Sequence, residues 1–360
     1  MVLGHKEDSG KKIFLLSICV CLFSTYFWSL NLLLPDFLTA LGFIVLYTLM
    51  YSDQKTAKHI FDHFLILLCA SSHISNVPLY VVALVFFLVF RKKMHIPGER
   101  RYVRIKFAAI AVLLGISYLI MSSAISKSKA IFFAGNLAQK GIFQKYLQKV
   151  CSTEEYRLCN FKDSLPFSFE YFVWNEKSPL YRLGGWKTMR HELGQINTGC
   201  LRDPQLLRDY FARSFIQVQQ QLKMFLIGEG NGPFGQGTVL YERIQKYFCF
   251  DHRLSNNSFQ SQGAMLQLNR LNSLYYILGI FTFVVFIGTG IGMLRRSSAP
   301  IKGFFLMTIL LIAANSVLVS FSSEISHRHG CKLHWLMVVS IFLIVVQRCK
   351  RQILLAGSNI

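Results

Sequence analysis

The segment SSEISHRHGCKLHW, residues 322–335, concentrates ionisable side chains beside two strongly apolar segments. Its candidate anion ligands are His327, Arg328, His329 and Lys332. The planar fork of an arginine matches phosphate geometry, an ammonium adds a point charge, and imidazoles form hydrogen bonds. We interpret the cluster as an anion-binding site. In the alternative interpretation, Arg328 and Lys332 are helix-end cations that extend to lipid headgroups, and the histidines only lie at the interface.

A membrane must position these groups, because the chain is more apolar than a soluble domain. Of its 360 residues, 52% are hydrophobic and 14% aromatic, and the mean hydropathy is +0.38. The formal net charge of +21 lies in short clusters between apolar segments, as the positive-inside rule describes, and is not spread over a globular surface. We therefore predict a polytopic membrane protein and no nucleic-acid partner.

The apolar segments predict about eight transmembrane helices, since one crossing of a ~30 Å hydrocarbon core needs about 20 residues. The expected positions are two helices within residues 11–51 that separate at Pro35-Asp36, two within 64–90, one at 107–121, and three at 274–294, 304–321 and from about 333 onward. The result is an all-α protein with both termini in the cytoplasm.

Residues 64–90 could form one long kinked helix or a hairpin that turns at SSHISN. The segment that follows, residues 91–106, is the densest cationic loop of the chain and is expected in the cytoplasm. Only the hairpin places this loop on the same side as the other basic segments of the N-terminal region. We therefore favour the hairpin.

Three regions follow from this layout. Residues 1–121 form an N-terminal membrane region with five helices, residues 122–272 form an extracytoplasmic domain between helices five and six, and residues 273–360 form a C-terminal membrane region with three helices. Helical spacing of apolar residues predicts a mainly helical external domain, with one helix that starts at Asp203-Pro204 and ends at Gly228 and Gly230.

The external domain contains an even number of cysteines, which favours disulfides outside the cytoplasm. The candidates are Cys151, Cys159, Cys200 and Cys249. The short spacing of Cys151 and Cys159 makes a local loop plausible, but four cysteines allow three pairings, and a zinc site is the alternative. The aromatic segment LPFSFEYFVWNEKSPLYRLGGW is either a loop packed by its own rings or a surface on which Trp174 and Trp186 stack against a sugar or lipid.

Polar residues gather at the expected outer ends of the helices. They include Asp36, His73, Asn76 and the cluster at 322–335, so one interface beneath the external domain is expected to hold them together. The chain contains none of the phosphate-loop, dinucleotide, HExxH or GxSxG motifs of soluble enzymes. We therefore predict no cofactor and no metal. The sequence does not indicate a divalent cation.

Two resemblances add to these predictions. The motifs YRLCNFKDSLP, FVWNEKSPLYRLGGW and HRHGCKLHW resemble a set of bacterial inner-membrane proteins with a cysteine-containing external loop, which implies a bacterial inner membrane location. The layout of helices also resembles the GT-C superfamily of glycosyltransferases, which take sugars from polyprenyl-phosphate donors. This chain has fewer helices and a shorter first external loop than those enzymes usually have.

The GT-C resemblance implies a specific chemistry. Asp36 would act as base on the acceptor hydroxyl, with Glu324 as the reserve acid, and the cluster at 322–335 would hold the lipid phosphate. The expected function is a glycosyltransferase that uses a polyprenyl-phosphate-linked sugar in cell-envelope glycan or lipid modification. The alternative is a non-enzymatic envelope assembly or lipid-binding subunit whose external domain docks a partner protein.

Overall fold

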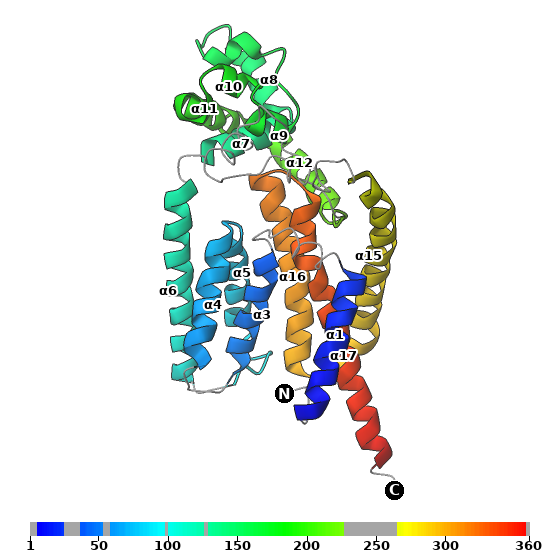
Figure 1. The fold of residues 1–360 in the computed structure, drawn as a ribbon. Helices are drawn as coiled ribbons and strands as arrows, with labels where there is room; N and C mark the ends of the chain where they lie inside the picture. The colour runs from blue at the N-terminus through cyan, green and yellow to red at the C-terminus, as the bar shows by residue number, and fades with distance from the viewer. Residues whose placement is uncertain are drawn as a thin grey trace, which may run out of the picture.

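The computed structural model describes residues 6–24, 37–52, 58–97, 100–125, 129–226 and 265–357, and these residues are helical apart from turns and short links. A bundle of long apolar helices supports a smaller helical domain at one end (Figure 1). The bundle consists of α1 (Lys6–Phe23), α3 (Leu38–Tyr51), α4 (Lys58–Ser72), α5 (Asn76–Phe90), α6 (Arg100–Ile125), α15 (Met265–Met293), α16 (Ala299–Ser322) and α17 (His327–Gly357). The prediction of an all-helical fold is therefore confirmed for the residues that the structure describes.

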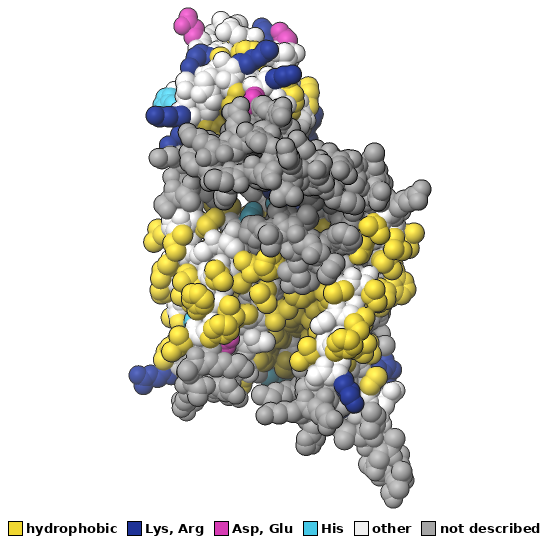
Figure 2. All heavy atoms as spheres, viewed as in Figure 1, with side chains coloured by type: hydrophobic (Ala, Val, Ile, Leu, Met, Phe, Trp, Pro, Cys, Tyr) yellow, Lys and Arg dark blue, Asp and Glu magenta, His cyan; other side chains and the backbone are white. Residues whose placement is uncertain are grey.

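Four of the described helices are long and apolar enough to cross a membrane: Arg101–Ser122, Leu271–Gly292, Ala299–Ser322 and His327–Gln352. Their outer faces carry exposed apolar side chains, such as Ile291 at 78% exposure, and hydrophobic side chains cover the flank of the bundle in Figure 2. Helices α3, α4 and α5 have only 14 or 15 residues, or about 22 Å each. Because this length is below a ~30 Å core, the count of eight crossings stays a prediction.

Residues 58–90 form a hairpin of two helices, as predicted. Asn76, which begins α5, holds the turn: its Nδ2 donates to the carbonyl oxygen of Cys69 at 2.8 Å and to Ser72 Oγ at 3.1 Å, near the end of α4. Thr39 of α3 donates to Asn76 Oδ1 at 2.7 Å. The fully buried amide thereby joins α3, α4 and α5 at one end of the bundle.

The smaller domain has its own buried apolar core, distinct from that of the bundle. It consists of α7 (Lys129–Gln139), α8 (Ile142–Val150), η2 (Arg157–Phe161), α9 (Phe169–Trp174), α10 (Pro179–Arg182), α11 (Gly185–Arg202) and α12 (Pro204–Gln221). Helices α6 and α15 extend past the expected domain boundaries, to Ile125 and from Met265. The helix predicted to start at Asp203-Pro204 does so, because Asp203 accepts hydrogen bonds from the Gln205 and Leu206 amides.

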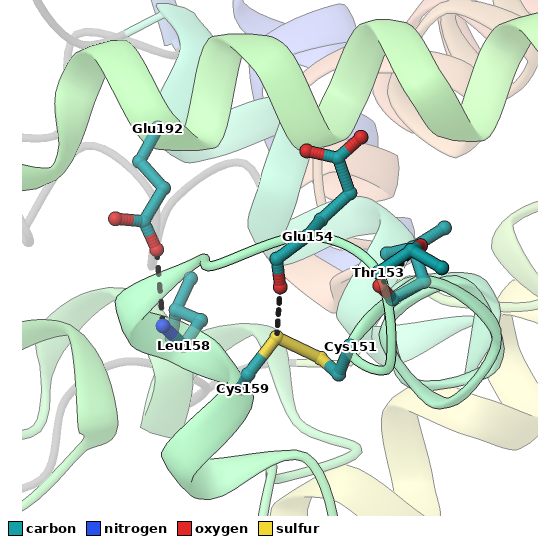
Figure 3. The surroundings of a disulfide bond; sticks show 7 residues. Cys151, Thr153, Glu154, Leu158, Cys159 and Glu192 are labelled. Atoms are coloured by element: carbon teal, nitrogen blue, oxygen red, sulfur yellow. Dashed lines mark hydrogen bonds between the residues drawn. A yellow bond between two sulfur atoms is a disulfide. The ribbon is translucent and has the colours of Figure 1, made fainter.

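One predicted disulfide is present, between Cys151 and Cys159, with the Cα atoms 5.6 Å apart. Glu192 of α11 accepts hydrogen bonds from the amide of Leu158 at 3.0 Å and from Arg157 Nε at 3.2 Å, which ties the disulfide loop to α11 (Figure 3). Cys200 is a free thiol, and its burial raises its pKa to about 12. Cys249 lies outside the described residues.

The domain joins the bundle at the end of α16. Tyr210 of α12 donates to the carbonyl oxygen of Phe321 at 2.5 Å. Lys140, at the end of α7, donates to the carbonyl oxygen of Ser320 at 2.8 Å and to Asn136 Oδ1 at 2.6 Å. These contacts satisfy carbonyl groups that the last turn of a helix leaves without intrahelical partners.

Candidate anion-binding site

Two histidines and a lysine meet where the first turns of α17 pack against the α4–α5 turn. Lys332 Nζ lies 2.9 Å from Ser75 Oγ, and His73 Nδ1 lies 2.7 Å from the same oxygen. The rings of His73 and His329 face each other with centroids 6.1 Å apart. His329 and Lys332 are three residues apart on α17, a spacing that places both on one helix face. The structure thus brings together His73, His329 and Lys332, three of the predicted site residues.

Two of these polar side chains are almost completely buried. Lys332 is 1% exposed and His329 is 3% exposed. Neither ring nitrogen of His329 has a hydrogen-bond partner, and neither does Nε of Arg328, among the groups that the structure describes. An unsatisfied buried polar group costs about 1–3 kcal/mol, so His329 offers hydrogen-bonding capacity that the protein itself does not use.

The position of Lys332 decides between the two interpretations of this residue. Its ammonium turns into the bundle and bonds Ser75, and so does not extend outward to a lipid headgroup. The interpretation as a helix-end cation therefore fails for Lys332. Arg328 is half-buried, so its exposed part is still able to reach a headgroup.

Another part of the cluster docks the segment that follows α12. Gln221 pairs with the backbone of Ser326, donating to its carbonyl oxygen at 2.8 Å and accepting from its amide at 2.9 Å. His327 Nδ1 accepts a hydrogen bond from the amide of Leu226 at 3.0 Å. His327 is therefore engaged at the contact between α17 and the residues after α12.

This contact explains why α12 ends at Gln221, seven residues short of the predicted end at Gly228. The backbone at Met224 lies directly on Gly330: a Cβ added to Gly330 would lie 1.7 Å from the carbonyl oxygen of Met224. Phe225 stacks on His334 with ring centroids 4.9 Å apart and an interplanar angle of 12°. The chain leaves the helix at this point because its backbone and rings pack against α17.

The remaining predicted residues lie apart from this group or are already engaged. Asn76 uses both amide hydrogens within the protein. Glu324 is half-buried in the link between α16 and α17, and Asp36 lies outside the described residues. Trp174 and Trp186 lie in the α7–α12 domain, where their ring centroids are 5.1 Å apart and both rings pack against Phe132.

Trp186 also donates its indole N–H to the carbonyl oxygen of Val173 at 3.2 Å, whereas Trp174 keeps 45% of its surface exposed. The interior of the aromatic segment is therefore packed by its own rings, and only Trp174 offers a ring surface to solvent. Sequence reasoning missed Ser75, the hydroxyl between His73 and Lys332. No signal marked it, because serine is common in turns and at helix ends.

Two groups that can donate to a phosphate meet here, the Lys332 ammonium and the His329 imidazole, with the Arg328 guanidinium on the same helix. The half-buried ring of His73 lies beside them, and its Nδ1 accepts a hydrogen bond from the Ser75 amide at 3.2 Å. Charge-assisted hydrogen bonds to phosphate are about twice as strong as neutral ones. In the described part of the chain no group of three or more His, Cys, Asp or Glu residues could hold a metal ion. Glu324 is the acid that the structure describes in the same segment as these donors.

Comparison of the chain with protein-family models, with curated proteins and with solved structures found no match. The site is therefore interpreted from its own geometry.

Proposed function

We propose that the protein binds the phosphate group of a polyprenyl-phosphate-linked sugar between α17 and the α4–α5 turn. The observation that carries this proposal is His329, a buried imidazole with two unsatisfied ring nitrogens beside the Lys332 ammonium. A phosphate oxygen would accept from the protonated ring nitrogen of His329 and from the Lys332 ammonium, and so would recover part of the cost of their burial.

The depth of the site fits a lipid. Because α4 and α5 are about 22 Å long, the turn between them lies below the level at which α6 and α16 end, as Figure 1 shows. A phosphate at this depth belongs near the boundary between headgroups and acyl chains. An apolar polyprenyl chain would then contact the outer surface of the bundle, where exposed apolar side chains are abundant.

The distribution of cations supports an extracytoplasmic location for the domain. The opposite end of the bundle carries the basic segments at residues 91–93, 295–296 and 348–351. By the positive-inside rule, this end faces the cytoplasm, so both chain termini lie there and the site faces outward. The resemblance of three sequence motifs to those of bacterial inner-membrane proteins supports a location in a bacterial inner membrane.

Sugar transfer is the activity that we propose for this site. The cations would stabilise the charge that remains on the departing phosphate, and Asp36, with Glu324 in reserve, would take the proton of the acceptor hydroxyl. The GT-C resemblance supports this role for an acid near the first outer loop. Binding and transfer are separable, since a base is needed only in the chemical step.

A second candidate function, docking of a partner protein, is favoured by one observation. Helix α12 exposes Phe215 and Ile216 on the external domain, at 58% and 55% exposure. An exposed apolar patch of this kind is typical of interaction surfaces. In this alternative the chain is a lipid-binding or assembly subunit without catalytic activity.

The test of the lipid site is photo-crosslinking of the full chain in micelles with a photoreactive farnesyl phosphate. The probe without phosphate, a photoreactive farnesol, reports adventitious apolar binding. His329→Leu should lower phosphate-dependent crosslinking about tenfold, the effect of losing one charge-assisted hydrogen bond. The matched control is His334→Leu, which removes another buried imidazole of α17, one that stacks on Phe225.

Equal losses in the two variants, or equal crosslinking of the phosphate and the alcohol, would contradict the phosphate site. Asp36→Asn separates the two functions. In a transferase it should keep crosslinking and lose sugar transfer from a polyprenyl-phosphate sugar, whereas retained transfer would remove Asp36 from the chemistry.

A further inference from the structure

The external domain contains an open groove of about 1100 Å³ that the lipid site does not use. One face of α11 forms its floor, and the rings of Tyr146 and Tyr156 stand beside it. The groove lies within the α7–α12 domain, whereas His329 and Lys332 lie on α17 in the bundle. A ligand in the groove is therefore independent of a phosphate at the lipid site.

The groove is basic along its length. The cationic side chains that line it are Lys187, Arg190 and Arg202, with His191 beside them. Spacings of three, four, eleven and fifteen residues along α11 return to nearly the same face of a helix, so these groups form one row. Lys187, Arg190 and Arg202 are exposed, which leaves them accessible to a ligand.

One carboxylate, that of Asp203, lines the groove, and it is already engaged. Lys149 Nζ lies 2.5 Å from its Oδ2, and the amides of Gln205 and Leu206 donate to its Oδ1. The hydrogen bond from Lys149, followed by the one from the Leu206 amide, holds the pKa of the Asp203 carboxyl below its usual value. The carboxylate thus pairs with Lys149, which is not one of the cations on α11.

The rest of the lining suits a polyhydroxylated ligand better than a protein. Gln195, Thr198 and the two tyrosine hydroxyls offer hydrogen bonds, and the other contributors are Ala130, Gly194 and Gly199. Among the described residues that line the groove there is no large aliphatic side chain, although the core of a protein–protein interface is usually apolar. Aromatic faces with neighbouring hydrogen-bonding groups match the apolar and hydroxylated faces of a sugar ring.

Two glycines shape the groove. A Cβ added to Gly199 would lie 2.0 Å from the Tyr146 hydroxyl, so the absence of a side chain there lets the Tyr146 ring rest on α11. Burial and the neighbouring Tyr156 raise the pKa of Tyr146 to about 12, and its phenol stays neutral near pH 7 and does not repel an anion. A Cβ added to Gly194 would meet nothing within 4 Å, so this position opens into free space.

We propose that this groove binds an acidic oligosaccharide, whose carboxylate or phosphate groups bond the cations on α11 while a sugar ring packs against Tyr146 and Tyr156. The row from Lys187 to Arg202 spans about 22 Å, since 15 residues rise 1.5 Å each in a helix. A ligand of several sugar units is needed to contact both ends. The groove thereby adds a glycan-binding function to the domain, whether or not the bundle transfers a sugar.

The test measures binding of hexagalacturonate to the full chain in micelles by isothermal titration calorimetry. Neutral maltohexaose and the acidic peptide hexaglutamate are the two comparison ligands. Hexagalacturonate should bind saturably, and Lys187→Gln with Arg202→Gln should weaken it at least about tenfold, because charge-assisted hydrogen bonds are lost. The matched charge control is Lys162→Gln with Lys177→Gln, two exposed lysines of the same domain outside the groove, which should leave binding unchanged.

Gly194→Phe provides a test by filling the groove. Because nothing lies near the position of its Cβ, the substitution should keep the melting temperature of the chain and abolish binding. Equal affinity for hexaglutamate would overturn the carbohydrate assignment in favour of a general anion surface. Absent binding of hexagalacturonate, or equal effects of the Lys187/Arg202 and Lys162/Lys177 double substitutions, would overturn the site itself.

Discussion

Gly330→Ala should detach the segment after α12 from α17. The new methyl carbon would lie 1.7 Å from the carbonyl oxygen of Met224 and 2.9 Å from its carbonyl carbon, whereas real Cβ atoms essentially never approach heavy atoms within 3.0 Å. Both neighbours are backbone atoms, which cannot rotate away as a side chain does. The segment around Met224 must therefore move off the helix.

The size of the effect follows from the bonds that this movement breaks. Gln221 and Ser326 share two hydrogen bonds of 2.8 and 2.9 Å, and Leu226 donates to His327 at 3.0 Å. At about 0.5–1.5 kcal/mol each, the three bonds contribute about 3 kcal/mol. Alanine stabilises a helix by up to about 1 kcal/mol relative to glycine. We therefore expect a net loss of about 2 kcal/mol in local stability.

Hydrogen–deuterium exchange of the full chain in micelles measures this loss directly. Peptides that contain the Ser326 and Leu226 amides should exchange about 30-fold faster, since 1.4 kcal/mol corresponds to a factor of ten. Gly194→Ala is the matched control, because a Cβ at that position meets nothing within 4 Å. If Gly330→Ala exchanged at the parent rate, the close packing of Met224 on α17 would be wrong.

Three further predictions concern topology, the disulfide and pH. In intact cells, Lys177→Cys on the α7–α12 domain should react with a membrane-impermeant maleimide, and Lys92→Cys should not. The parent chain gives the background reaction. The reverse pattern would overturn the extracytoplasmic orientation of the domain. Cys159→Ser opens a loop with a sequence separation of 8 and should lower the stability of the domain by about 2.5 kcal/mol in thermal unfolding, while unchanged melting would contradict a stabilising bridge. Burial lowers the pKa of Lys140 to about 7, below its value in the unfolded chain. Between pH 7 and 9 the unfolded chain therefore binds more protons than the folded one. The free energy of unfolding should rise by about 2 kcal/mol over that range. Lys140→Met should remove this rise, and an unchanged pH dependence would show that another group causes it.

The pH prediction depends on the groups around Lys140. Its ammonium lies 5.2 Å from the centre of the Tyr210 ring, and Arg213 donates to its backbone carbonyl at 2.5 Å. Burial raises the pKa of Tyr210 to about 12, so its phenol keeps its proton throughout pH 7–9. Lys140 is therefore the group whose protonation we expect to change at this junction between pH 7 and 9.

Local features of the chain were predictable from sequence, because they depend on neighbours along the chain. Apolar length placed the membrane helices, and the basic loop at residues 91–106 favoured the α4–α5 hairpin that the structure contains. Asp203 and Pro204 marked the start of α12, since a carboxylate caps the first amides and proline needs no amide bond there. The short separation of Cys151 and Cys159 made their pairing the plausible local loop, and loop closure is least costly over short distances.

The direction in which each side chain of α17 points was decided only by the tertiary structure. Residues 331–340 are buried without interruption, so no single solvent-facing side marks the opposite face, the one that meets the α4–α5 turn. The contact of Lys332 with Ser75 joins residues 257 positions apart, and the pairing of Gln221 with Ser326 joins residues 105 apart. Sequence patterns placed His329 and Lys332 near the start of the last apolar helix. The packing of distant segments determined that they turn inward, because helix rotation depends on partners that local sequence does not specify.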